Sequence, residues 1–125
     1  MKPMEMKNLD YQHEPNPLAC GQAVIAMICG KSAEEICKES GKENELTLRE
    51  MRALLEKNGF EISEQKKSFK DKSELPKLAM LSLETPRCWH WSLAYDGIFY
   101  DPEHGVSEFL TECNRRYFWK ITKIN

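Results

Sequence analysis

The pattern of hydrophobic and polar positions divides the chain into a helical half and a β half. Between Cys20 and Gly59, apolar side chains recur at the intervals of helices that pack one face on a core. Three such stretches end at a glycine, a residue that commonly terminates helices: Gly30, Gly41 and Gly59. Capping-box sequences precede two of them, at Ser32 and Thr47. The pattern therefore predicts three helices before residue 60.

From residue 60 onward, short apolar and alternating stretches are typical of strands. Asp96-Gly97 separates two of these stretches and is a strong signal for a two-residue hairpin turn. The strands are expected at 60–62, 78–83, 89–95, 98–100 and 116–124. The charged run 66–72 is expected to be a solvated loop, and 107–113 a helical turn.

Helices followed by antiparallel strands predict an α+β fold, with the N-terminal helices packed on a C-terminal antiparallel sheet. Residues 1–19 contain three prolines and no sustained periodicity, so this segment is expected to be an extended arm. No internal repeat or flexible linker interrupts the sequence. A single domain, 1–125, is therefore expected, with the helical part at 20–59 and the mainly β part at 60–125.

Composition narrows the function classes. The chain has 125 residues, 41% of them hydrophobic, and a formal net charge of −2. Eighteen basic against twenty acidic residues leave no positive excess to attract a nucleic acid. No apolar run approaches the roughly 20 residues that span a bilayer. The first residues lack the apolar segment of a signal peptide, so a cytoplasmic location is expected.

Cysteine is the unusual residue in this composition. An odd number, five, argues against a closed set of disulfides: Cys20, Cys29, Cys37, Cys88 and Cys113. Two of them, Cys29 and Cys37, fall in helical stripes and are expected in the core. A metal set of Cys88, His90 and Cys113 matches no zinc-module spacing, so no metal is expected. His13 and His104 have no partner that the sequence identifies, and both are expected to be exposed.

The hairpin brings a histidine and an aspartate together on geometric grounds. If Asp96-Gly97 forms a two-residue turn, Ser92 lies opposite Asp101, and His90 is the diagonal neighbour of Asp101 on the same face. Diagonal positions lie about 7–8 Å apart, within reach of an imidazole and a carboxylate. A one-residue bulge would place the two side chains on opposite faces.

Cys20 supplies a candidate nucleophile. It lies at the predicted start of a helix, where the helix dipole and free N–H groups favour a thiolate. A thiolate beside an imidazole that a carboxylate orients is suited to attack an amide carbonyl. Gly21 adds no side chain that would obstruct a substrate. Gln12 could donate to the developing oxyanion together with the Cys20 backbone N–H.

Two segments together resemble the papain-like cysteine peptidases. These are Gln12 to Met27, which contains Cys20-Gly21, and His90 to Pro102, which contains the hairpin and Asp101-Pro102. More narrowly, they are similar to the bacteriocin-processing peptidases, which act on double-glycine leaders, and to their stand-alone relatives. The resemblance covers about residues 8–105. Gln12 lies eight residues before Cys20, two more than is usual in that group.

The resemblance implies a papain-like fold and a cysteine peptidase acting on a peptide or protein substrate without metal or cofactor. Cys20 would be the nucleophile and His90 the general base and acid. Asp101 would orient the imidazole, and Gln12 would help form the oxyanion hole. The same triad could instead transfer acyl groups or hydrolyse a non-peptide amide. A peptide-binding module without turnover is the non-enzymatic alternative.

Overall fold

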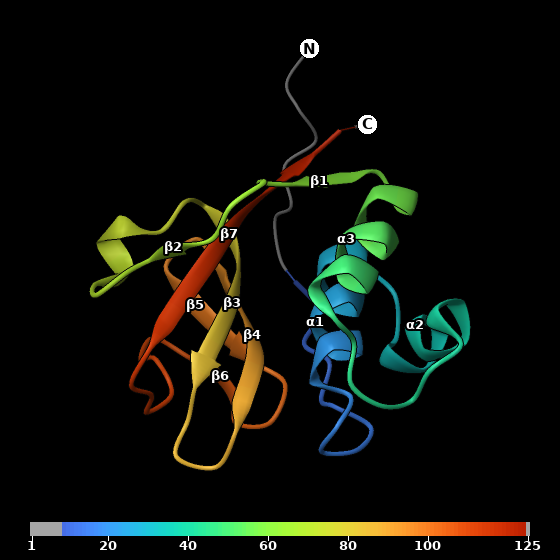
Figure 1. Ribbon diagram of the computed structural model, residues 1–125, viewed down its shortest axis with the longest axis horizontal. Coiled ribbons are helices and arrows are strands. Elements are labelled where there is room, and N and C mark those ends of the chain that lie inside the picture. Colours follow the sequence, from blue (N-terminus) through green and yellow to red (C-terminus); the bar gives the residue numbers. More distant parts are fainter. Residues whose placement is uncertain (1–8, 125) are drawn as a thin grey trace.

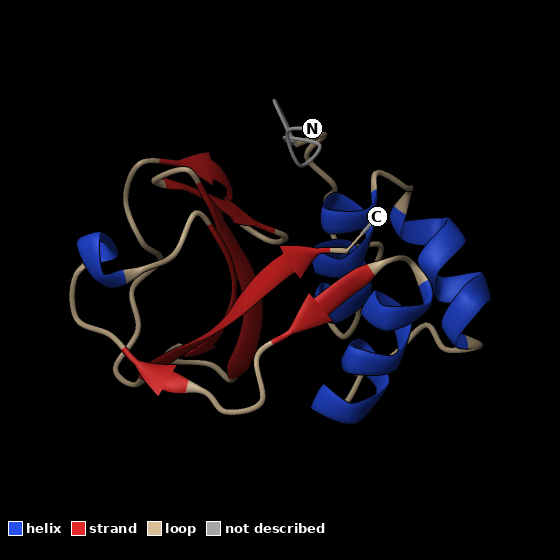
Figure 2. Cartoon of the chain, turned by 90° about the horizontal axis from the view of Figure 1, so that it is seen from above, coloured by secondary structure: helices blue, strands red, loops and turns tan. Residues whose placement is uncertain are grey.

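Three helices come first in the chain and pack against an antiparallel sheet formed by the rest of it (Figure 1 and Figure 2). The structure is a computed structural model that describes residues 9–124. The helices are α1 (Cys20–Cys29), α2 (Ala33–Ser40) and α3 (Leu48–Lys57). The α+β class predicted from the sequence is confirmed. Of the predicted arm, residues 9–19 contain no regular helix or strand, and residues 1–8 lie outside the described residues.

Local sequence explains where the helices begin and end. The Ser32 side chain accepts a hydrogen bond from the Glu35 N–H, and the Glu35 side chain accepts one from the Ser32 N–H. Thr47 and Glu50 form the same reciprocal cap at α3. By contrast, no side chain among residues 9–124 caps the start of α1, which begins at Cys20. The first N–H groups of α1 are therefore left for another acceptor.

In the part of the chain that the structure describes, seven strands form the sheet. They are β1 (Phe60–Ile62), β2 (Lys67–Ser68), β3 (Leu78–Glu84), β4 (Trp89–Tyr95), β5 (Ile98–Asp101), β6 (Gly105–Ser107) and β7 (Arg116–Lys123). The main path runs β1-β7-β3-β4-β5-β6, and β2 also pairs with β7. All pairings are antiparallel. The last strand in the sequence is thus an interior strand of the sheet.

The β4–β5 hairpin has the predicted register. Tyr95 pairs with Ile98, so only Asp96 and Gly97 lie in the turn. Both turn residues have positive φ, 51° at Asp96 and 82° at Gly97. This is the backbone of a type I′ turn, whose twist matches that of the two strands it joins. The turn therefore fixes which residues of β4 face which residues of β5.

Two short segments differ from the prediction. The run 66–72 is not wholly a loop, because Lys67–Ser68 pairs with β7, and the buried Phe69 anchors it against Phe118. Residues 107–113 contain no helical turn. Ser107 ends β6, and its hydroxyl accepts the Phe109 N–H, which favours a bend over a helix.

Apolar side chains pack on both faces of the sheet. One cluster fills the space between the helices and the sheet, and includes Met80 and Leu93. The second lies on the opposite face and includes Leu81 and Ala94. Successive side chains of a strand point to opposite faces, so β3 and β4 contribute to both clusters. Among the described residues, no helix is both long enough and apolar enough to cross a bilayer.

Candidate active site

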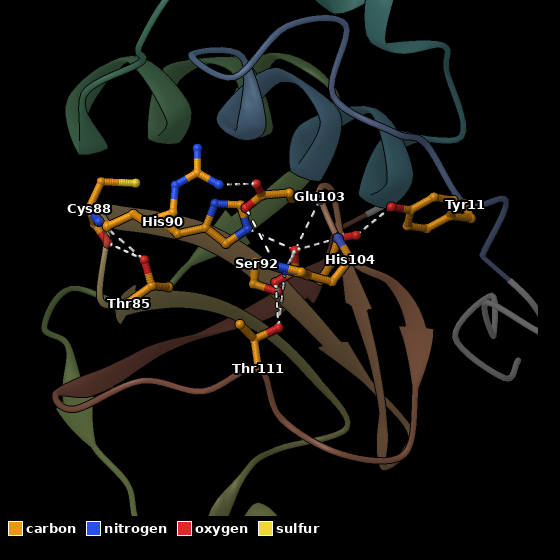
Figure 3. A network of polar contacts seen from close by, with 10 residues as sticks. Tyr11, Thr85, Cys88, His90, Ser92, Glu103, His104 and Thr111 are labelled. Atoms are coloured by element: carbon orange, nitrogen blue, oxygen red, sulfur yellow. Dashed lines mark hydrogen bonds and ion pairs between the residues drawn. The ribbon is translucent and has the colours of Figure 1, made fainter.

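His90 and Asp101 form a buried pair across the β4–β5 hairpin. Figure 3 shows His90, Ser92 and Thr111 in the network of polar contacts to which this pair belongs. His90 Nε2 lies 2.8 Å from Asp101 Oδ1, and the two side chains are 5% and 4% exposed. The contact joins the diagonal neighbours that the two-residue turn predicts, so the geometric prediction is confirmed. With Nε2 held by the carboxylate, Nδ1 is the ring nitrogen left to face another group.

The Asp101 carboxylate is surrounded by hydrogen-bond donors. Oδ2 accepts from the Ser92 hydroxyl at 3.0 Å and from the Thr111 hydroxyl at 3.2 Å. Oδ1 accepts from the backbone N–H groups of Glu103 and His104 at 3.0 and 3.1 Å. These contacts satisfy an ionised carboxylate in a buried place and fix its orientation toward His90.

Opposing effects set the pKa values of the pair. Burial raises the pKa of Asp101, but the hydrogen bond and charge of His90, with two backbone N–H groups, hold it well below its usual range. Burial lowers the pKa of His90, but interactions with Asp101 and with the Cys20 side chain raise it to about 10. At neutral pH the structure therefore favours an imidazolium paired with a carboxylate.

Cys20 lies beside His90, as the sequence predicts. It is the first residue of α1, its thiol is free, and it is 8% exposed. Cys20 and His90 line the same cavity of about 240 Å³. The Cys20 side chain is also a hydrogen-bond partner of the His90 imidazole. Cys20, His90 and Asp101 are thus brought together in one place.

The cavity beside Cys20 is largely apolar. Leu18 and Leu46 line it on the helical side, and Trp89 and Trp91 line it from β4. The Trp91 indole N–H donates to the Leu46 carbonyl at 3.3 Å and so holds that wall in place. A cavity of this kind, with a reactive group at one side, can seat an apolar side chain of a substrate.

The arm before α1 packs against the Asp101 end of the hairpin. The Tyr11 hydroxyl donates to the Asp101 carbonyl oxygen. The Glu14 N–H donates to the Pro102 carbonyl oxygen at 3.0 Å. These two bonds connect the segment leading into Cys20 with the strand that ends at Asp101. The arm therefore helps to position the helix start relative to the His90–Asp101 pair.

The Gln12 side chain does not lie with Cys20, His90 and Asp101. Its Oε1 accepts the Ala33 N–H at 3.1 Å, so its side chain lies at the start of α2. Gly21 also differs from the interpretation given to it. A Cβ at this position would meet Leu46 and Trp91 at 3.3 Å, so the missing side chain allows close packing inside the protein.

Sequence reasoning missed two neighbours of the site. His104 is half exposed as expected, but it has a partner, because its Nδ1 lies 3.0 Å from Asp101 Oδ1. Glu14 is buried, and the charge of His90 acts on its carboxyl group. The first contact depends on the tight turn between β5 and β6, which the sequence analysis did not predict. No local pattern signals the second, because it depends on how the arm folds back.

The other cysteines lie elsewhere than at the start of α1 beside His90. Cys37 is buried and Cys29 is half-buried against the core, as predicted. Cys88 is exposed at the rim of the cavity that Cys20 lines.

Within residues 9–124, one group of side chains could approach a metal ion: His90, Glu103 and His104. Both histidines of this group already bind Asp101, and Glu103 pairs with Arg87, so ion pairing accounts for the cluster.

Neither of two comparisons with known proteins finds a match, so the interpretation of the site rests on its geometry. The chain matches no protein-family model. A search of curated proteins gives no match either.

Proposed function

We propose that the chain is a cysteine peptidase with a papain-like fold, in which Cys20, His90 and Asp101 form the catalytic triad. One observation carries the proposal: a buried His–Asp pair adjoins a free thiol at a helix N-terminus, at the edge of an apolar cavity. Each member has the partner that nucleophilic catalysis needs. The motif resemblance of the two segments supports the same activity.

In this mechanism the Cys20 sulfur attacks the carbonyl carbon of a peptide bond. The C–N bond then breaks, and the imidazolium of His90 gives its proton to the leaving amine. The acyl group remains on sulfur as a thioester. Neutral His90 next takes a proton from water, whose oxygen attacks the thioester carbon. The carboxylic acid leaves, and the imidazolium and thiolate are restored.

Asp101 serves this cycle by orienting the ring and stabilising its charged form. His90 alternates between imidazolium and imidazole, and only the Nδ1 proton needs to move. The carboxylate keeps Nε2 protonated throughout, which leaves Nδ1 for exchange with sulfur and substrate. Because Ser92 and Thr111 hold the carboxylate in turn, the ring has little freedom to rotate away from Cys20.

Labelling with a peptidyl chloromethyl ketone tests the triad directly. The wild-type chain should be labelled at Cys20, as located by peptide mass spectrometry, and a Cys20→Ala variant should lose that label. His90→Ala should slow the labelling by at least a hundredfold, whereas Cys88→Ala, which removes the other thiol of the cavity, should not. Labelling of Cys20 at the same rate in wild type and in His90→Ala would overturn the proposal.

Product analysis separates hydrolysis from transfer. A peptide mixture is incubated with the wild type and with Cys20→Ala, with and without an added amine such as hydroxylamine. Hydrolysis gives new carboxylic acid ends that depend on Cys20. Products found only as amine adducts would identify an acyltransferase in place of a peptidase.

A further inference from the structure

Among residues 9–124, Glu45 is the one acidic residue in the lining of the cavity beside Cys20. Glu45 is exposed, and it precedes Leu46, whose carbonyl oxygen accepts the Trp91 indole N–H. Trp89 and Trp91 also line the cavity. They lie two positions apart on β4, so their side chains share one face of the strand. An acidic residue and two indole rings therefore border the same space.

The charge of Glu45 differs from the other charges around this cavity, because it is not balanced within the described part of the chain. Cations that touch or adjoin the lining residues are each paired with an acidic side chain: Lys42 with Glu50, His90 with Asp101, Arg115 with Glu84, and Arg87 with Glu103. Within residues 9–124, Glu45 pairs with no basic side chain. The cavity lining therefore carries one unbalanced negative charge, which a cationic group of a substrate would complement.

The indole rings favour the same kind of ligand. The face of an aromatic ring attracts a cation that lies within about 6 Å of the ring centre. Trp89 is 48% exposed, and the Arg115 guanidinium already lies 5.4 Å from its ring centre. Two hydrogen bonds to the Glu84 carboxylate offset the charge of this guanidinium. The cavity thus combines apolar walls, which suit an aliphatic stem, with indole faces and a carboxylate, which suit a positive charge.

We propose that this cavity binds a lysine or arginine side chain of the peptide substrate, and that Glu45 selects that side chain. This inference rests on the proposed function and names the substrate class of the same site. The methylene stem lies along Leu18, Leu46 and the indole rings, and the charged end meets the Glu45 carboxylate. Because Cys20 borders the same cavity, the bond that is cleaved lies close in sequence to the basic residue.

Peptides that differ in one side chain test this preference. Each set carries lysine, norleucine or glycine at one position near the cleaved bond, and the position is varied from set to set. Norleucine keeps the aliphatic stem of lysine without its charge, and glycine offers the cavity no side chain. The ratio of kcat/KM for lysine to that for norleucine is measured in the wild type, in Glu45→Gln and in Glu45→Lys. Glu43→Gln is the matched control, because Glu43 is exposed on the same loop but does not line this cavity.

At one position the wild type should cleave the lysine peptide with a kcat/KM about tenfold above that of the norleucine peptide, the order expected for an exposed ion pair with a cation–π contact. The ratio should fall toward one in Glu45→Gln and below one in Glu45→Lys, where like charges repel. Glu43→Gln should keep the wild-type ratio. Added salt should lower the ratio in the wild type, because it screens exposed charges.

Three results would contradict the inference. One is an equal ratio in the wild type and in Glu45→Gln, and another is a fall in Glu43→Gln as large as that in Glu45→Gln. The third is a glycine peptide cleaved as fast as the lysine peptide at every position. In each case cleavage that is lost in Cys20→Ala leaves the peptidase proposal intact. A wild-type chain that cleaves none of the peptides, and whose Cys20 the chloromethyl ketone does not label, would overturn the peptidase proposal and this inference with it.

Discussion

His90 and Asp101 are separated by eleven residues in sequence, yet their side chains meet at 2.8 Å with almost no exposure to water. The contact depends on one two-residue turn, because that turn decides which side chains of β4 and β5 share a face. Around the pair, donors from three segments fix the carboxylate. The candidate chemistry is therefore built into the register of the sheet.

The pH dependence of stability should reveal the pair. The Asp101 pKa is lowered, so its contribution is present above the ordinary aspartate pKa of about 3.9 and is lost as the pH falls toward the lowered value. The His90 pKa is raised to about 10, so its contribution is complete below about 6.5 and is lost as the pH rises toward 10. The pair should stabilise the fold most between about pH 4 and 6.5.

Urea unfolding of the wild type and of Asp101→Asn, measured below, inside and above this pH window, tests how much the pair contributes to stability. The free energy of unfolding should differ by about 3 kcal/mol inside the window, since one partner of a buried pair is removed. The difference should shrink below about pH 4 and above about pH 6.5. A difference that stays constant from pH 4 to pH 10 would show that the two side chains are not an ion pair.

The Ser92 and Thr111 hydroxyls both donate to Asp101 Oδ2, so their contributions to the free energy of unfolding should depend on each other. Ser92→Ala removes a buried hydrogen bond and should lower the free energy of unfolding by about 1–2 kcal/mol. Thr111→Val should cost less, because Thr111 is partly exposed. In the double variant the two losses should not add, since both hydroxyls bind the same oxygen. Simple additivity in urea unfolding would argue that Asp101 is held by its other donors alone.

The turn at Asp96-Gly97 should control the site from a distance. Insertion of one residue there should place His90 and Asp101 on opposite faces and return the His90 pKa, followed by NMR, toward its ordinary value. Gly97→Ala keeps the register and should only cost about 1 kcal/mol, because its φ of 82° disfavours a side chain. Gly41→Ala, at φ 70° and far from the site, is the matched control. A His90 pKa unchanged by the insertion would contradict this dependence.

The free thiols should differ in reactivity according to burial. Burial raises the pKa of Cys29 to about 12, so at pH 8 almost none of it is thiolate. Cys88 is exposed and should react with iodoacetamide before Cys29 does. Mass spectrometry of the native protein after short exposure, compared with the urea-unfolded chain, checks this order. Equal labelling of Cys29 and Cys88 in the native protein would count against the packing of α1 described above.

Local rules explain which parts of the fold were predictable. Capping sequences and glycine stops act within one or two helical turns, so the sequence predicts α2 and α3 closely. The Asp96-Gly97 turn likewise predicts the register, and with it the His90–Asp101 contact. The strand at Lys67–Ser68 was not predictable, because its partner in β7 lies about fifty residues away.

The path of the arm was also beyond local rules. Whether Gln12 or Glu14 approaches the site depends on how a segment without regular structure packs against Pro102, and apolar spacing carries no information on that. The two residues are separated by a single histidine in sequence. A shift of two positions along an extended segment is therefore enough to exchange an amide for a carboxyl group beside the candidate triad.

The interior place of β7 has a consequence for how the protein is made. Residues 116–123 lie between β1 and β3, so β3 keeps an exposed pairing edge while the ribosome is still adding them. By that time Cys20, His90 and Asp101 have all been synthesised. A nascent chain thus carries every proposed reactive group before its sheet can close. The sheet that carries the proposed site is therefore completed by a strand that holds none of the three groups.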